Sequence, residues 1–242
     1  MGLLKGFIWL FVGFFVVILG VAQVMILFLD CMMKDIHTHR LTIHRDSELW
    51  SCSYKDRSAL YVQQAVHISV GIHPWYITDE DYSAQQEWVV QMLRDPRVIA
   101  LGEGGLDKLC ATPMMLQEKA FRWLIERSEE NRLPLIIHCV KCTSELLRLK
   151  KEYKPVSPWI IHGFRGKPQQ ASEYLRHGLY LSYGERYAVE ALRQTPVERL
   201  FLETDESNIE IEELYKRVAD CREISLKTLK DSVIENINRV FY

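Results

Sequence analysis

Apolar residues recur with two different spacings along most of this 242-residue chain. Short continuous runs rich in valine, isoleucine and leucine predict strands that are covered on both faces, as in a parallel sheet. The eight predicted strands are Lys34–His39, Leu49–Tyr54, Val66–His73, Val98–Glu103, Pro134–Cys139, Trp159–His162, Leu179–Ser182 and Leu200–Glu203. Helical patterns separate many of them, at Asp79–Arg94, Met114–Asn131, Thr143–Tyr153, Pro168–His177 and Glu185–Gln194, with two more between Glu210 and Val240. Because strands and helices alternate, we expect an α/β fold, a (β/α)₈ barrel of the TIM type with irregular early units.

The N-terminal segment follows a different pattern, because the chain from Phe7 to Leu29 carries no charged residue. As a helix, a segment of this length would be about 34 Å long, enough to cross a hydrocarbon core of about 30 Å. Two interpretations stay open: a membrane anchor, or upstream sequence included by a start codon chosen too early, ahead of Met33. We therefore divide the chain into a hydrophobic segment, residues 1–32, and one domain, residues 33–242.

Composition narrows the class of protein. The chain is 48% hydrophobic and 26% charged, which excludes a disordered chain, and only one segment is apolar and long enough to span a membrane. A formal net charge of -2 argues against a general nucleic-acid coat, although not against a local basic site. We expect a cytoplasmic protein, or a membrane-anchored one if residues 7–29 are translated.

Histidines and acids gather where the predicted strands end, which in a barrel is the face that carries chemistry. These residues are His37, His39, Glu103, His138, His162 and Asp205. His37 and His39 are two positions apart on one strand, so their side chains point to the same side. Each residue alone has a structural explanation; Asp205, for example, could cap the helix that follows it. Burying the whole set would be costly without a compensating cation, so the set predicts a metal site.

Six motifs in chain order carry a resemblance to a known family: Asp35-Ile36-His37-Thr38-His39, Gly71-Ile72-His73-Pro74-Trp75, Gly102-Glu103-Gly104-Gly105-Leu106-Asp107, Leu135-Ile136-Ile137-His138, His162-Gly163-Phe164-Arg165-Gly166 and Leu202-Glu203-Thr204-Asp205. From about Lys34 to its C-terminus the chain resembles the TatD metal-dependent hydrolases, which are related to deoxyribonucleases. The resemblance implies an amidohydrolase-like barrel with two divalent cations. It also implies phosphodiester hydrolysis, typically the removal of nucleotides from DNA in the 3′ to 5′ direction.

The resemblance assigns metal ligands in two groups that share a bridging Glu103: His37, His39 and Asp205 for one ion, and His138 and His162 for the other. Two such ions would clamp a phosphate and lower the pKa of a bound water. Asp205 would orient that water or accept its proton, so Asp205 and Glu103 are the expected catalytic residues. The identity of the ions stays open among Mg²⁺, Mn²⁺ and Zn²⁺.

Residues around these ligands receive further roles. His73 and Arg165 are expected to hold a substrate phosphate, and the two acids Glu203 and Asp107 to support the metal ligands. The aromatic pair that follows His73, Trp75 and Tyr76, is suited either to stacking on a base or to packing.

The chain departs from the family pattern at two places. Lys141 stands near a position where the family often has arginine, and Glu206 follows Asp205 where many members approach a proline. The expected partner is therefore DNA or another phosphodiester, with no protein partner evident. Two alternatives stay open: a metal-dependent amide or lactone hydrolase on the same barrel, and a membrane-tethered binding protein without turnover.

Overall fold

Eight parallel strands form one sheet in chain order in the computed structural model, which describes residues 33–40, 42–58 and 64–242. The strands are β1 (Asp35–Thr38), β2 (Glu48–Ser53), β3 (His67–Gly71), β4 (Val98–Asp107), β5 (Leu135–Val140), β6 (Trp159–Ile161), β7 (Tyr180–Tyr183) and β8 (Leu200–Leu202). All eight predicted strands are present, so the predicted TIM-type barrel is confirmed.

The barrel closes through the backbone of Asp205, three residues after the end of β8. Its N–H donates to the carbonyl of His37 at 2.9 Å, and its carbonyl accepts the N–H of His39 at 3.2 Å. These bonds join the last strand region to β1, whose histidines therefore lie beside Asp205.

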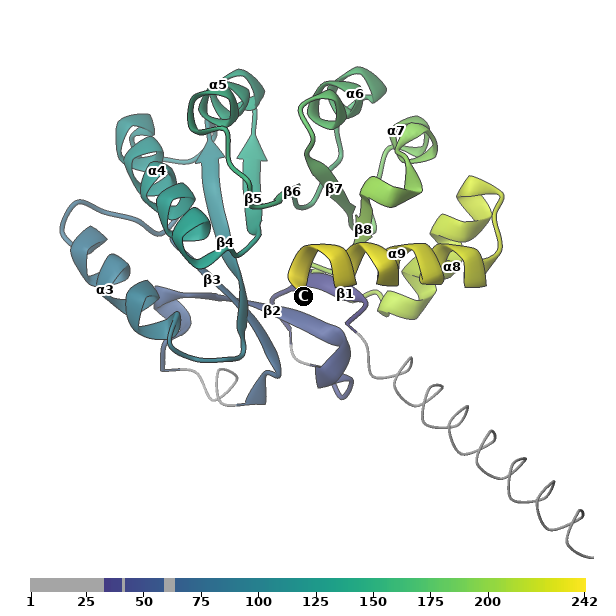
Figure 1. Ribbon diagram of the computed structural model, residues 1–242, viewed down its shortest axis with the longest axis horizontal. Helices are drawn as coiled ribbons and strands as arrows, with labels where there is room; N and C mark the ends of the chain where they lie inside the picture. Colours follow the sequence, from purple (N-terminus) through teal and green to yellow (C-terminus); the bar gives the residue numbers. More distant parts are fainter. Residues whose placement is uncertain (1–32, 41, 59–63) are drawn as a thin grey trace, which may run out of the picture. The chain divides into compact units, whose positions relative to one another are not determined.

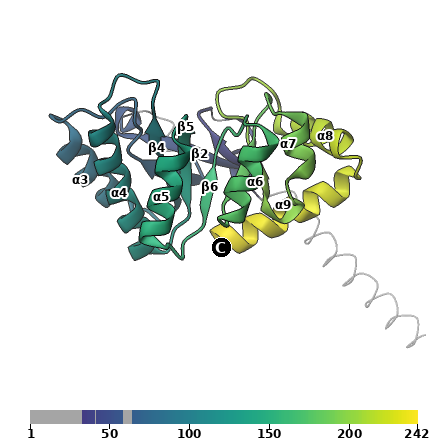
Figure 2. The same ribbon diagram turned by 90° about the horizontal axis from the view of Figure 1, so that it is seen from above.

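Helices cover the outside of the sheet, as Figures 1 and 2 show. They are α3 (Tyr82–Met92), α4 (Met114–Asn131), α5 (Thr143–Tyr153), α6 (Pro168–Arg176), α7 (Val189–Gln194), α8 (Ile211–Arg222) and α9 (Leu226–Phe241). Short 3₁₀ helices follow β1 and β2 and precede β8: η1 (Arg45–Ser47), η2 (Tyr54–Asp56) and η3 (Val197–Arg199). The first unit of the barrel is irregular, as expected. Among the described residues between β1 and β2, the short 3₁₀ helix η1 stands where a regular unit has an α-helix.

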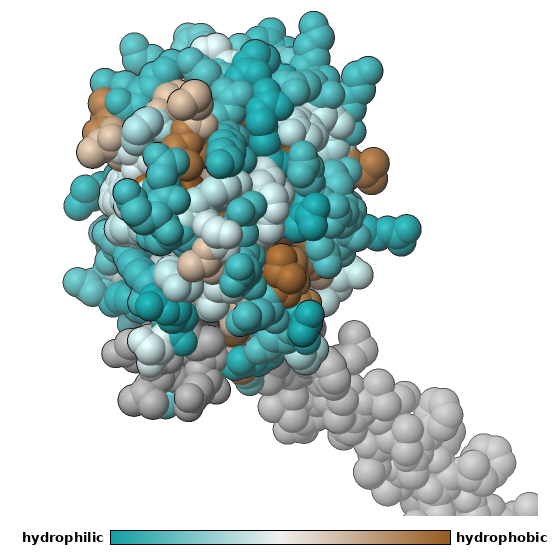
Figure 3. All heavy atoms as spheres, turned by 90° about the vertical axis from the view of Figure 1, so that its left-hand side faces the viewer, coloured by the Kyte–Doolittle hydropathy of each residue, from teal (hydrophilic) through white to brown (hydrophobic). Residues whose placement is uncertain are grey.

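Burial follows the sequence pattern. Leu135, Ile136 and Ile137 are successive residues of β5 and all are fully buried, as a strand covered on both faces requires. The outer surface seen in Figure 3 is mostly hydrophilic, with only separated hydrophobic spots. Among the described residues, no helix is both long and apolar enough to cross a membrane. The hydrophobic N-terminal segment and its predicted span, residues 7–29, lie outside the described residues.

Strand β4 is longer than predicted, since it runs to Asp107 instead of ending at Glu103. The glycines around Glu103 resemble a turn in sequence, but they serve close packing of β4 against β5. Gly105 has a φ of 147°, and a Cβ added there would overlap the carbonyl oxygen of His138. Only glycine allows the two strands to approach this closely, and Glu103 consequently lies within the strand.

We predict that Gly105→Ala destabilises the barrel by about 2 kcal/mol or more, because the added methyl group must push β4 away from His138. Gly178→Ala is a matched control: Gly178 also has a positive φ, 76°, but open space around its missing Cβ. The control should lose only about 1 kcal/mol, the cost of the backbone conformation. Urea unfolding measures both free energies, and equal losses in the two variants would contradict the close-packing explanation.

Candidate metal centre

The carboxylate of Glu103 lies at the centre of a cluster of histidines inside the barrel mouth. Five histidines place a ring nitrogen within 3.4 Å of it: His37, His39, His73, His138 and His162. Its Oε1 atom lies 2.7 Å from His162 Nε2 and 2.8 Å from His138 Nδ1. Its Oε2 atom lies 3.4 Å from Nε2 of both His37 and His39. One carboxylate that is only 6% exposed therefore has imidazoles on both of its oxygens.

Asp205 stands beside the two histidines from β1. Its Oδ1 lies 3.8 Å from His37 Nε2 and 3.7 Å from His39 Nε2, and its side chain remains 23% exposed. The Asp205 backbone has a φ of 54°, a left-handed conformation that aspartate tolerates better than most residues. The preceding residue, Thr204, is anchored to β1: its hydroxyl donates to Asp35 Oδ2 at 2.6 Å and its N–H donates to Asp35 Oδ1 at 3.1 Å.

Two further carboxylates lie behind the histidines, as the sequence predicted. Asp107 Oδ2 is 3.0 Å from His138 Nε2, the ring nitrogen opposite the one that faces Glu103. Glu203 is fully buried, accepts the N–H of Gly163 at 2.5 Å and lies 3.4 Å from His162 Nδ1. Carboxylates in these positions fix the tautomer and orientation of an imidazole and leave its other nitrogen free to bind a metal.

The electrostatics keep the central acid ionised. Burial alone would raise the pKa of Glu103, but the charge of His162 and hydrogen bonds from His138 and His162 hold it well below its usual range. Burial opposes the charge on His39 as well, yet the hydrogen bond to Glu103 and the charge of Asp205 leave the pKa of His39 raised. The centre thus attracts positive charge, whether as protons or as metal ions.

The donor set fits divalent metal ions. His37 is completely buried, and neither of its ring nitrogens has a hydrogen-bond partner. An unpaired buried polar group is costly, so a ligand for His37 is expected. The side-chain atoms form four overlapping groups of three that are close enough to share an ion: His37, His39 and Asp205; His37, Glu103 and His162; His73, Glu103 and His138; and His162, Glu203 and Asp205.

The structure brings all six sequence-predicted metal ligands together. His73, predicted as a phosphate contact, lies deeper than expected, because its Nε2 is 3.0 Å from Glu103 Oε1. Arg165 stays at the rim, 57% exposed, with a guanidinium nitrogen 4.0 Å from Asp205 Oδ2. Lys141 and Glu206 are exposed. Sequence reasoning missed Asp35 as a support, although it lies two residues before His37 on β1, so that both side chains point to the same side of the strand.

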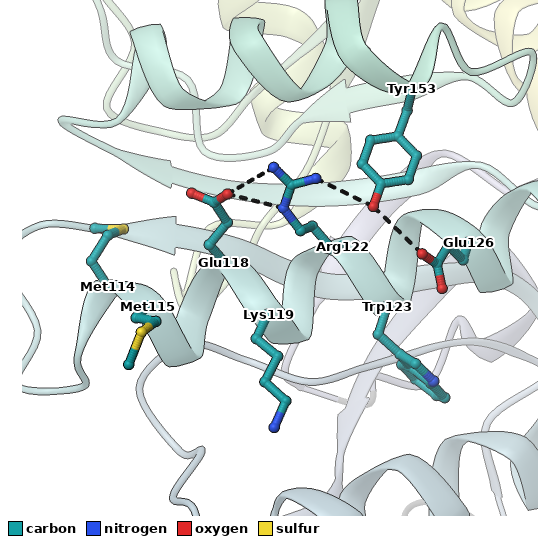
Figure 4. Close-up of a pocket in the computed structure, with 8 residues that line it drawn as sticks. All are labelled: Met114, Met115, Glu118, Lys119, Arg122, Trp123, Glu126 and Tyr153. Carbon is teal, nitrogen blue, oxygen red and sulfur yellow. Dashed lines mark hydrogen bonds and ion pairs between the residues drawn. The ribbon is translucent and has the colours of Figure 1, made fainter.

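A separate hollow of about 570 Å³ lies on the outer side of α4 and α5 (Figure 4). Its lining includes Trp123, Glu118 and Arg122, and the last two are ion-paired at 2.9 Å. No residue of the histidine cluster lines it, so this hollow is not part of the candidate metal centre.

An all-parallel barrel with histidines and acids converging at its mouth is the architecture of the metal-dependent hydrolase barrels. Within that class, the chain belongs to the TatD related DNase family, to which its residues 51–242 match.

Individual relatives agree with this placement. Over 201 residues the chain is 26% identical to the uncharacterized metal-dependent hydrolase YabD of Bacillus subtilis, covering 73% of this chain and 77% of that protein. It is 30% identical over 149 residues to the 3′-5′ ssDNA/RNA exonuclease TatD of Citrobacter koseri. That match covers 57% of this chain and 56% of the exonuclease, so the chain spans little more than half the length of this relative.

Among solved structures, the crystal structure of YJJV, a TatD homologue from Escherichia coli K12, superposes with a TM-score of 0.73. The superposition covers 88% of this chain and 98% of that one at 17% sequence identity, and it supports the fold.

We predict that Mn²⁺ or Zn²⁺ raises the thermal unfolding midpoint, and that Glu103→Gln abolishes most of this rise. At 100 times the dissociation constant a ligand stabilises by about 2.7 kcal/mol, which corresponds to roughly 5–10 °C for a domain of this size. The matched control is Glu190→Gln, at an exposed residue of α7. Differential scanning calorimetry with metal or with a chelator measures the shift, and a full rise in the Glu103→Gln variant would exclude Glu103 as a ligand.

Proposed function

We propose that this chain is a metal-dependent phosphodiesterase that removes nucleotides from the 3′ end of single-stranded DNA or RNA. The observation that carries the proposal is the Glu103 carboxylate, buried with imidazoles on both of its oxygens. A carboxylate in this position is suited to bridge two cations a few ångströms apart, the arrangement of many phosphodiesterases. The name of the Citrobacter koseri relative, an exonuclease on single-stranded DNA and RNA, supports this substrate class and direction.

We infer two groups of ligands. His37, His39 and Asp205 would hold one ion, and these three side chains lie close enough to share it. His138 and His162, which both contact Glu103 Oε1, would hold the other, and Glu103 would bridge them; His73 contacts the same oxygen and could join the second group. Once bound, the two ions would clamp a phosphate, lower the pKa of a water molecule and stabilise the leaving oxygen. A ligand set this rich in imidazole favours Zn²⁺ or Mn²⁺ over Mg²⁺.

The partly exposed Asp205 has a role beyond ligation. Of the two expected catalytic acids, its side chain is the more exposed, 23% against 6% for Glu103. Asp205 is therefore the residue placed to orient the attacking water and to accept its proton. The guanidinium of Arg165 next to it would hold a non-bridging phosphate oxygen of the substrate.

We predict that the protein with added Mn²⁺ shortens a 5′-labelled single-stranded oligonucleotide stepwise from its 3′ end. His138→Ala should lower this activity at least about tenfold, because it removes a metal ligand and leaves the Asp107 and Glu103 carboxylates without their contacts to His138. His177→Ala, at an exposed histidine after α6, is the matched control.

Lactone and amide substrates tested beside the oligonucleotide distinguish the alternatives. Turnover of these substrates alone would overturn the proposed function, and full activity in the His138→Ala variant would overturn the site assignment.

We also predict that Arg165→Ala raises the KM for single-stranded DNA by about 3- to 10-fold, since a phosphate contact at a partly exposed site is lost. The dependence of log KM on log salt should become shallower by about 0.7, the contribution of one phosphate contact on a single strand. Arg193→Ala is the control, because Arg193 is similarly exposed but lies on α7, where it pairs with Glu223. An unchanged salt dependence in the Arg165→Ala variant would remove this residue from the substrate site.

A further inference from the structure

Trp75 is half exposed at the edge of the histidine cluster, yet it is held in a fixed position. Its side chain, in the loop after β3, is 51% accessible to solvent. Its indole Nε1 donates to the buried Asp107 Oδ2 at 2.7 Å, and its backbone N–H donates to His73 Nδ1 at 3.0 Å. A large apolar ring that is anchored at its polar edge but left open to solvent is suited to contact a ligand.

The ring stands directly beside two histidines of the candidate metal centre. Its centroid lies 5.1 Å from that of His73 and 5.5 Å from that of His138, and both pairs are nearly perpendicular. A group that stacks on Trp75 would therefore be within one nucleotide of a phosphate held at the centre.

Positive charge accompanies the aromatic residues. Tyr76 packs against His73 with ring centroids 5.0 Å apart, and Lys55 from η2 places its Nζ 3.6 Å from the centroid of the Tyr76 ring. Within the described part of the chain, Lys55 has no carboxylate partner. Lys55, Arg57 and Tyr76 also line a hollow of about 290 Å³.

One acid, Asp81, lies in the wall of the same hollow. Its Oδ1 already accepts the N–H of Thr78 and the side-chain amide of Gln85, both at 2.9 Å. These donors are neutral and do not offset its negative charge, so one acid lines the hollow beside the two cations Lys55 and Arg57. The two cations suit the phosphates of a nucleic-acid strand.

We propose that Trp75 stacks on a base of a single-stranded nucleic acid and thereby selects single-stranded over double-stranded ends. This inference rests on the proposed function and names the residue that recognises its substrate. Both faces of a base inside a duplex are already stacked on neighbouring pairs, whereas an unpaired base near a strand end can leave its neighbours. Lys55 lies where it can contact a phosphate of the same strand.

A purely structural role for Trp75 is the competing explanation, because its hydrogen bond to Asp107 supports His138. Two variants separate the explanations. Trp75→Phe keeps an aromatic face and loses the hydrogen bond to Asp107, while Trp75→Ala loses both. Trp123→Ala is the matched control, since Trp123 is a half-buried tryptophan in the separate hollow on α4 (Figure 4).

The experiment measures cleavage of three strands by the Mn²⁺-loaded protein: oligothymidylate, the same strand with abasic residues at its 3′ end, and a duplex. In the Trp75→Ala variant the KM for oligothymidylate should rise about tenfold or more, the effect of losing one aromatic stack. Cleavage of the abasic strand should stay within about twofold of wild type, and the preference for single strands over duplex should shrink. Trp75→Phe and Trp123→Ala should resemble wild type on all three strands.

Equal losses on the normal and abasic strands in both Trp75 variants would overturn stacking in favour of support through Asp107. An unchanged KM in the Trp75→Ala variant would overturn it as well. If the wild type cleaves no strand, the proposed function fails. The stacking proposal is then decided by fluorescence anisotropy of dye-labelled oligothymidylate, which must bind more weakly to Trp75→Ala than to the control for the proposal to stand.

Discussion

The contact between one buried carboxylate and five imidazoles is the constraint on which the rest of the barrel mouth depends. The histidines come from β1, the ends of β3 and β6, and β5, and they meet only because Glu103 on β4 lies between them. Without this anion, five imidazoles would crowd together with unpaired nitrogens in a place that water barely reaches, at a cost of several kcal/mol. The position of Glu103 in turn requires β4 to pass very close to β5, which the glycine at position 105 permits. The burial of the Glu103 charge among the histidines therefore depends on the close backbone packing of β4 against β5.

A second layer of acids gives the histidines their orientation. Asp107 and Glu203 contact the outer nitrogens of His138 and His162, while Asp35 fixes the backbone on either side of the barrel closure. Imidazoles held from behind cannot rotate away from the centre, so little ordering remains to be done when a cation binds. His37 has no acid behind it, because its contacts are with Glu103 and Asp205, 3.4 and 3.8 Å from its Nε2 on the side of the centre. Its ring is completely buried and makes no hydrogen bond of good geometry among the described residues, an environment that favours a metal ion.

Much of this arrangement is predictable from sequence, since the apolar runs locate every strand and the ends of parallel strands meet on one face. The predictions that depend on one strand alone succeed: His37 and His39 share a side of β1, and Asp205 follows β8. Predictions that depend on how closely two strands approach each other are wrong. The sequence predicts that β4 ends at Glu103, whereas the strand continues through Gly104 and Gly105 to Asp107, where its backbone packs against the carbonyl of His138. The depth of His73 is likewise fixed by Glu103, which is distant in sequence.

The balance of charge at the centre has a consequence for substrate binding as well as for chemistry. Five acids are close to the histidine cluster: Asp35, Glu103, Asp107, Glu203 and Asp205. Burial raises the pKa of Asp35 to about 8, so the negative charge comes mainly from the other four. Arg165 stands at the rim beside Asp205, and Lys55 lies over the ring of Tyr76, which packs against His73. The raised pKa values of His39 and His162 offset this negative charge only in part, so a phosphate diester entering the mouth without bound cations would meet a local negative potential. The net charge of -2 for the whole chain does not reveal it. Divalent ions held by His37, His39, Glu103, His138, His162 and Asp205 would offset this negative charge and favour a phosphate at the centre. Under the proposed function, the affinity for a nucleic-acid strand should therefore depend on metal as strongly as its cleavage does, with Trp75 and Arg165 as the proposed contacts outside the metal centre.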